Sequence, residues 1–247
     1  PVFALIEQGN YGWGSPVVFL PLVLGLLSFA AFLFWQARAP HPMLPLGLFR
    51  IRNFWAGNIA TVFIYAALSL GGFVLAIYLQ QVAGFSATFA ALATLPTSIA
   101  NVALSSWFGS LSGRFGPRIF MTVGPILAGI GTLMYSGLGD EVNYWTQVLP
   151  GVIVFSLGLS MTVAPLTSAI LGSVPTTQSG IGSATNNAIS RVAGLVAIAM
   201  IGVIAGGTID VVSFQPLMFV TAGLLFAGAL SSWLGVRNPK PEVVPAR

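Results

Sequence analysis

The sequence predicts an all-α membrane protein with seven transmembrane helices. Of its 247 residues, only 9 are Lys or Arg and 5 are Asp or Glu, so 6% of the chain is charged. An ordinary soluble domain has roughly 25% charged residues. Hydrophobic residues make up 56% of the chain, and the mean hydropathy is +0.92. Because a soluble protein must cover its surface with polar groups, this composition excludes a soluble enzyme, a nucleic-acid binder and a disordered chain.

Seven stretches are long and apolar enough to cross a bilayer, which takes about 20 residues in a helix. They are far longer than the roughly 10-residue strands of a membrane barrel, so helices are the predicted form. Residues 1–15 are expected to hold the end of a truncated helix, whose upstream part lies outside this sequence, and an outer loop. The predicted spans are 17–35, 54–79, 88–109, 119–138, 147–172, 180–206 and 216–236.

The segments between the spans alternate in charge. If successive spans cross in opposite directions, eight basic residues fall on one side: Arg38, Arg50, Arg52, Arg114, Arg118, Arg237, Lys240 and Arg247. The other side carries Glu7, Asp140, Glu141 and Asp210 and no Lys or Arg. The positive-inside rule then predicts a multi-pass protein of the plasma (inner) membrane with a cytoplasmic C-terminus. The basic composition therefore reflects topology, and no nucleic-acid partner is expected.

Polar residues recur at helical spacing on four of the spans, where positions three, four and seven apart share a face. Small and hydroxyl residues commonly hold membrane helices together, and Ser or Thr can bond to its own backbone. Asparagine is costlier in hydrocarbon and needs a partner or water, so a wet cavity is the other interpretation. The stripes are Asn58, Thr61, Tyr65, Ser69, Gly72 and Gln80; Thr94, Thr97, Ser98, Asn101 and Ser105; Ser156, Ser160 and Thr167; and Ser183, Asn186, Asn187, Ser190, Arg191 and Gly194.

After the first span, two polar spans and a weakly polar one occur twice in succession, which suggests the inverted repeat of a transporter half. Six residues are expected to face a substrate cavity: Asn58, Tyr65, Asn101, Met161, Asn186 and Asn187. The aromatic ring and the thioether among them would supply an adaptable apolar wall.

Arg191 is the only charged residue inside a predicted span. If its helix begins near Gly180, it lies about 16 Å deep, at 1.5 Å per residue. It is either an anchor that reaches the interface or a cavity cation for an anionic group. No acid in the spans can pair with it.

The residue types that build catalytic or metal sites are scarce. There is no cysteine, and the single histidine, His41, has no acid near it in the sequence. We therefore predict no catalytic residue, no metal site and no bound cofactor.

Three segments resemble a known family. The loop from Gly109 to Arg118 is similar to the C-terminal copy of the major facilitator superfamily signature G-x-L-x-D-R-x-G-R-[RK], with Gly113 in place of the Asp. Residues 78–86, followed by Leu95-Pro96, and the run from Gly180 to Arg191 resemble fourteen-span drug:proton antiporters of the EmrB/QacA type.

The resemblance implies the C-terminal half of such an exporter. Residues 16–53 would be a linker transmembrane helix and cytoplasmic loop, 54–236 the six-helix C-terminal transporter domain, and 237–247 a cytoplasmic tail. Arg114 and Arg118 would serve gating or topology, with Arg191 near the cytoplasmic mouth.

By the same resemblance, the protein would export amphipathic small molecules by alternating access, with H+ as the coupling ion. Its partners would be the lipid bilayer and a missing N-terminal helical half. A major facilitator importer or uniporter is the alternative. A membrane-embedded enzyme and a non-transporting signalling or scaffold protein are remote ones.

Overall fold

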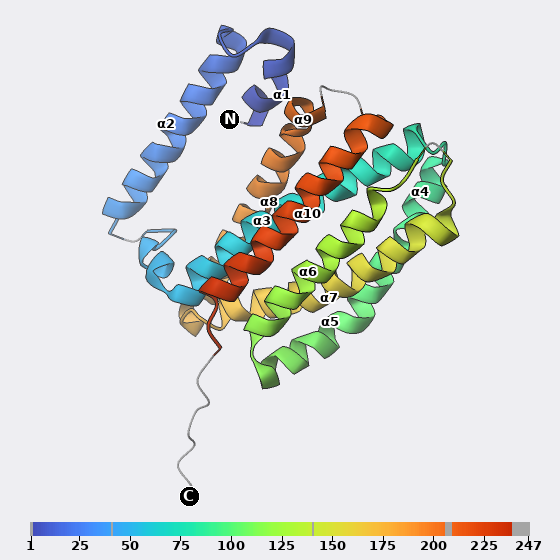
Figure 1. Ribbon diagram of the computed structural model, residues 1–247. Coiled ribbons are helices and arrows are strands. Elements are labelled where there is room, and N and C mark those ends of the chain that lie inside the picture. The colour runs from blue at the N-terminus through green and yellow to red at the C-terminus, as the bar shows by residue number, and fades with distance from the viewer. Residues whose placement is uncertain (1, 41, 140, 206–208, 239–247) are drawn as a thin grey trace, which may run out of the picture.

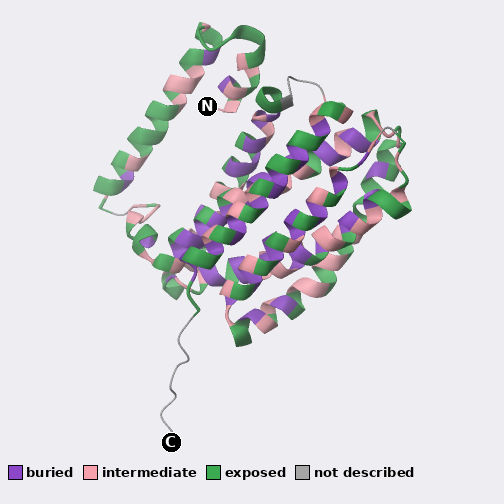
Figure 2. Ribbon diagram, viewed as in Figure 1, coloured by how far each residue is buried: buried purple, intermediate pink, exposed green. Residues whose placement is uncertain are grey.

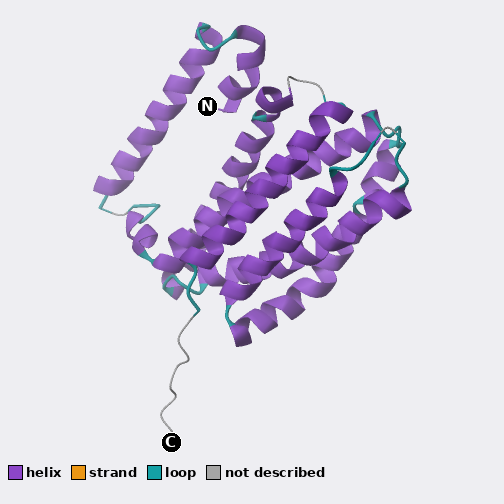
Figure 3. Ribbon diagram, viewed as in Figure 1, coloured by secondary structure: helices purple, strands orange, loops and turns teal. Residues whose placement is uncertain are grey.

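The computed structural model describes residues 2–40, 42–139, 141–205 and 209–238. Helices are the only regular secondary structure in these residues (Figure 3). Seven of the helical segments described are long and apolar enough to cross a membrane, which confirms the predicted fold class. His41, Asp140 and most of the predicted tail 237–247 lie outside the described residues.

The helices follow one another with short connections (Figure 1). In chain order they are α1 (Val2–Tyr11), α2 (Pro16–Arg38), η1 (Leu46–Arg50), α3 (Arg52–Gln81), α4 (Ala87–Ala93), α5 (Leu95–Phe115), α6 (Pro117–Tyr135), η2 (Tyr144–Val148), α7 (Leu149–Leu171), η3 (Thr176–Gln178), α8 (Ser179–Ala199), α9 (Ile201–Ala205) and α10 (Val211–Gly235).

Two predicted spans are interrupted. The span predicted at 88–109 divides into α4 and α5 at Thr94, because Pro96 stands at the start of α5 and has no N–H to continue the helical ladder. The span predicted at 180–206 divides into α8 and α9 at Met200.

The last span starts at Val211, before its predicted first residue, 216. The backbone N–H of Ser213 donates to the Asp210 carboxylate at 2.8 Å, and the backbone N–H of Asp210 donates to the Ser213 hydroxyl at 2.9 Å. This reciprocal capping box begins the helix upstream of the apolar run that predicted it.

Helices α3 to α10 form one bundle, and α2 stands beside it (Figure 1). Only 6% of the most apolar 18-residue window of α2 is buried, against 44–50% for α3, α6, α7 and α10 (Figure 2). The α5 and α8 spans are intermediate, with 11% and 28% buried. Much of the surface of α2, α5 and α8 therefore remains open to lipid or to further protein.

The α6–α7 contact is a seam of glycines. A Cβ on Gly131 would lie 2.5 Å from the backbone nitrogen of Phe155, and one on Gly158 would collide with the backbone of Ala128. Two helix backbones touch here without side chains between them, as small residues allow in membrane proteins.

The basic loops gather at one end of the bundle, which we call the basic end (residues 39–40, 42–51, 116, 172–178 and 236–238). Arg52 donates to the carbonyls of Gly235 and Leu234 at 2.9 and 3.0 Å, so the start of α3 holds the end of α10. The opposite, acidic end (12–15, 82–86, 136–139, 141–143 and 209–210) is tied by the Tyr78 hydroxyl, which donates to the Gly139 carbonyl at 2.9 Å. The basic and acidic sides predicted from the loop charges thus correspond to the two ends of the helix bundle.

The glycine seam predicts a selective loss of stability. Gly158→Ala should lower the free energy of unfolding by about 1–3 kcal/mol, the usual cost of overpacking, because its new Cβ meets backbone that cannot rotate away. Thermal unfolding of the purified protein measures this. Gly223→Ala on α10 is the matched control, since a Cβ there meets nothing within 4 Å. Equal melting temperatures for the two variants would contradict the seam.

Candidate functional site

A polar clasp joins α3 to α8 inside the bundle. The side-chain amide nitrogen of Asn186 donates to the side-chain amide oxygen (Oδ1) of Asn58 at 3.2 Å and to the Thr61 hydroxyl at 2.7 Å. Asn58 in turn donates to the Phe54 backbone carbonyl at 2.8 Å, and both Asn58 and Thr61 are buried. These two asparagines were predicted as cavity residues, and the structure brings them together as partners across a helix contact.

Many hydroxyls inside the spans bond to their own helix. Ten of them donate to the carbonyl four residues earlier: Thr61, Thr122, Thr132, Ser156, Ser160, Thr162, Thr167, Thr185, Thr221 and Ser232. Four of the ten belong to the predicted polar stripes, and their polarity is satisfied within their own helices without a cavity or water: Thr61, Ser156, Ser160 and Thr167.

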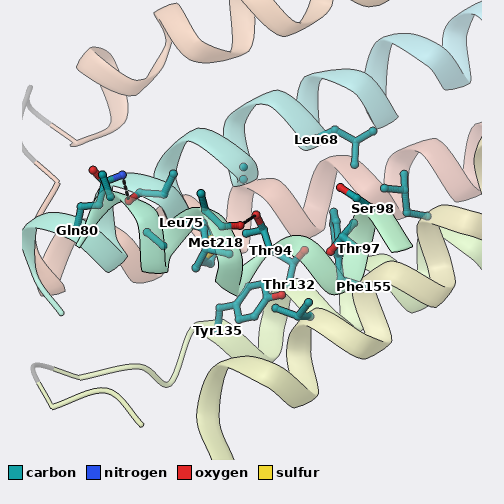
Figure 4. Close-up of a pocket in the computed structure, with 18 residues that line it drawn as sticks. Leu68, Leu75, Gln80, Thr94, Thr97, Ser98, Thr132, Tyr135, Phe155 and Met218 are labelled. Atoms are coloured by element: carbon teal, nitrogen blue, oxygen red, sulfur yellow. Dashed lines mark hydrogen bonds between the residues drawn. The ribbon is translucent and has the colours of Figure 1, made fainter. Parts of the chain in front are cut away.

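A cavity of about 420 Å³ lies where the third span is broken (Figure 4). It is enclosed by the half of α3 nearest the acidic end together with α4, α5, α6, α7 and α10. Its polar side chains are Gln80, Thr94, Thr97, Ser98, Thr132 and Tyr135, and residues such as Leu75, Phe155 and Met218 form apolar walls.

None of the residues lining the cavity carries a formal charge at neutral pH. Gln80, Thr94 and Ser98 are exposed, so the cavity is open toward α3 and the α4–α5 break. Apolar walls with a few hydroxyls and one amide are suited to an amphipathic compound that offers hydrogen-bonding groups.

Two contacts fix the broken span around this cavity. The hydroxyls of Ser156 on α7 and Thr97 on α5 are hydrogen-bonded to each other at 2.8 Å. The Tyr144 hydroxyl donates at 3.2 Å to the carbonyl of Ala93, the last residue of α4. The interruption is therefore held in place from α7 and η2, and one of its freed carbonyls is satisfied.

The other predicted cavity residues lie elsewhere. Asn101 is half-buried on α5 and accepts a hydrogen bond from Ser105. Tyr65 is half-buried on α3 and packs against the apolar core near the basic end. The Cβ of Met161 lies close to Gly124 at the α6–α7 seam. None of the six predicted residues lines the cavity, and their assignment to a substrate site stays a prediction.

The sequence stripes did contain four of the six polar lining residues, but Thr132 and Tyr135 were missed. They lie on α6, which the sequence showed as weakly polar. Their spacing of three residues on one helical face was the available signal.

Arg191 lies on the exposed face of α8, beside Asn187. Its Nε donates to the side-chain amide oxygen (Oδ1) of Asn187 at 3.1 Å. It is 12 residues from the start of α8 at Ser179, which is about 18 Å along the helix axis. Arg191 therefore lies near the middle of the candidate span Thr176–Ile204, and at the centre of a bilayer an arginine costs about 2.5–3.5 kcal/mol on insertion scales.

The two arginines of the α5–α6 turn differ in their contacts. Arg118 donates through Nε to the Trp233 carbonyl at 2.9 Å and lies 4.2 Å from the centre of the Trp233 ring. It therefore caps the end of α10, as expected of a cation at a helix C-terminus. Arg114 is exposed at the rim of a polar pocket of about 590 Å³ at the basic end, lined also by Ser112 and Asn238.

The described acids lie outside the spans. Glu7 is on α1, Glu141 follows α6, and Asp210 caps α10. Hydrogen bonds from Ser213 hold the pKa of the Asp210 carboxyl below its usual range, so this group stays ionised at neutral pH. Among the described residues, no group of three or more His, Cys, Asp or Glu could hold a metal ion.

Known proteins resemble this chain over most of its length. The sequence profile of the Major Facilitator Superfamily matches residues 2–198. The uncharacterized MFS-type transporter YhcA of Bacillus subtilis is 28% identical over 81% of this chain and 37% of its own length. The methylenomycin A resistance protein of Streptomyces coelicolor is 26% identical over 96% of this chain and 50% of its own. The multidrug resistance protein Stp of Mycobacterium tuberculosis is 30% identical over 81% and 37%. The chain thus spans half or less of the length of these curated relatives.

The Asn186 clasp predicts a measurable coupling between α3 and α8. In a double-mutant cycle, Asn186→Ala and Thr61→Val should show an interaction energy of about 0.6 kcal/mol, the average for interhelical hydrogen bonds in a membrane. Reversible unfolding in mixed detergent measures it. The control pair is Asn186→Ala with Thr221→Val, because Thr221 bonds only to its own helix and should give additive effects. Additivity in both pairs would refute the clasp.

Proposed function

The chain belongs to the Major Facilitator Superfamily, and from this we propose that the full-length protein is a secondary active transporter that exports amphipathic small molecules by alternating access. The observation that carries the proposal is the uncharged cavity at the broken third span. Broken helices lining a cavity are a recurrent way to build a substrate site inside a membrane.

The names of the relatives support export of this kind of compound. They include resistance proteins for methylenomycin A and lincomycin, the multidrug resistance protein Stp, and a tetracenomycin C resistance and export protein. These names denote transporters and resistance proteins, which indicates a transporter rather than the membrane-embedded enzyme considered as an alternative. The substrate of the present protein is proposed only as a class.

We also propose a second helical half. The relatives are at least twice as long as the part of them that this chain covers. The surfaces of α5 and α8 are largely unburied, and they flank the face on which the cavity is open. A second bundle against these two helices would close the cavity, with α3–α10 as one transporter domain and α2 as a linker helix beside it.

The orientation follows from charge. The basic end would face the cytoplasm of a bacterial-type inner membrane, which places the C-terminus inside. The coupling ion would be H+, and because no acid lies in the spans of this chain, the proton-binding carboxylate would belong to the other half.

An importer or uniporter of a small solute is the second candidate, since the fold does not fix direction. A transport experiment measures direction and energy coupling.

Inverted membrane vesicles containing the full-length protein should accumulate a lipophilic fluorescent dye when the vesicle interior is acidified. A protonophore should abolish the accumulation, because the proton gradient would drive it. Vesicles without the protein are the control. Protein-dependent entry that only equilibrates the dye and does not depend on the proton gradient would indicate a uniporter, and accumulation only in right-side-out vesicles would indicate an importer.

We expect the hydroxyl groups that line the cavity to contribute to the apparent affinity for the transported compound. Thr97→Val and Tyr135→Phe should each raise KM about 2- to 10-fold with little effect on kcat, since one net hydrogen bond contributes about 0.5–1.5 kcal/mol. The matched control is Thr167→Val, an exposed hydroxyl outside the cavity that bonds to its own helix. Asn101→Ala and Asn186→Ala test the residues predicted from sequence. If only the asparagine variants alter substrate range, the cavity is not the substrate site.

A further inference from the structure

We propose that Arg191, oriented by Asn187, is a docking point for one carboxylate at the middle of the membrane. The inference deepens the proposed function, because it names an acidic group as something the transport pathway recognises. Its basis is the geometry around Arg191 and the distribution of charge in the chain.

The first observation is that Arg191 has no countercharge from this chain. The five acids of the sequence all lie outside the spans. Of the helices packed against α8, α7 has no titratable side chain, α3 has Arg52, Tyr65 and Tyr78, and α1 has Glu7 and Tyr11. A charged group in a membrane interior pairs or lines a water-filled path, and no acid in the described spans can pair with Arg191, so a pairing anion would come from outside these spans.

The second observation is that the guanidinium is already oriented. The Nε of Arg191 donates to the side-chain amide oxygen of Asn187, and both residues lie on the exposed face of α8. Within the described part of the chain, no hydrogen bond engages the two terminal nitrogens of Arg191. A carboxylate can therefore bind those nitrogens, since guanidinium and carboxylate match in planar geometry.

The third observation concerns depth. At about 18 Å from the start of α8, Arg191 is too deep to be a simple interface anchor like the arginines at the basic end. Two of those arginines, Arg52 and Arg118, donate to carbonyls at the end of α10. Arg191 instead donates to the side-chain amide oxygen of Asn187.

The carboxylate has two possible sources: an acidic transported compound, or a side chain of the proposed second half. A binding experiment on purified full-length protein separates them, using N-dansyl-phenylalanine and its uncharged methyl ester as probes. If the source is the compound, the parent protein binds the acid at least 10-fold more tightly than the ester. Arg191→Gln then removes the preference, and Arg191→Lys keeps part of it.

If the source is a side chain, the two probes behave alike, and thermal unfolding shows the pair. A carboxylate whose pKa an arginine depresses stabilises the fold above its ordinary pKa of about 4, and that stabilisation is lost as pH falls through its pKa in the folded state. Arg191→Gln should therefore melt below the parent at pH 7, and the difference should narrow as the pH is lowered toward 3.

Asn187→Ala keeps the positive charge of Arg191. It should reduce about 3-fold either the preference for the acid over the ester or the pH-dependent difference in melting temperature. This variant keeps the proposal testable if Arg191→Gln fails to fold. Ser183→Ala, one turn earlier on the same exposed face, is the control and should match the parent. The proposal is overturned if Arg191→Gln changes neither the probe preference nor the pH dependence of melting. These readouts need no transport, so failure of the exporter proposal in vesicles remains a separate result.

Discussion

The hydrocarbon core of the bilayer cannot solvate a polar group, and this constraint explains most of the structure. Each span is helical because a helix satisfies its own backbone. Hydroxyls bond back to their helix, asparagines bond across a helix contact, and no buried side-chain nitrogen or oxygen among the described residues lacks a partner. Arginines at the basic end cap carbonyls of α10 at the bundle's rim. Among the described spans, the other arginines lie within a few residues of a span end, whereas Arg191 lies near the middle of its span, where a charge usually has a functional role.

Close packing between helices forms the central block of the domain, which consists of α6, α7 and α10. Glycines let α6 and α7 touch backbone to backbone, and α10 packs against α6 and α3. The broken span α4–α5 is then attached to this block by the Ser156–Thr97 and Tyr144–Ala93 hydrogen bonds. The cavity lies between this block, α3 and the interrupted helix α4–α5.

The proposed function divides the chemistry between two halves. This chain would offer an uncharged cavity for the compound and one deep cation, Arg191, for a carboxylate, and neither contains a titratable acid. A proton-coupled exporter needs at least one titratable acid inside the membrane, and that acid would belong to the other half. Substrate recognition and energy coupling would therefore lie on opposite sides of the same pathway.

Hydropathy and charge along the chain were enough to predict the seven spans and the gathering of the basic loops at one end, because both properties depend on local sequence and not on packing partners. The sequence pattern also identified Gln80, Thr94, Thr97 and Ser98 as members of polar stripes. Which members of the stripes contact one another depends on the packing of the helices. Asn58 and Asn186 bond to each other, whereas Thr132 and Tyr135, from a weakly polar helix, line the cavity. Sequence periodicity gives the direction in which a side chain points from the axis of its helix. The neighbour that the side chain contacts depends on how helices distant in the sequence pack together.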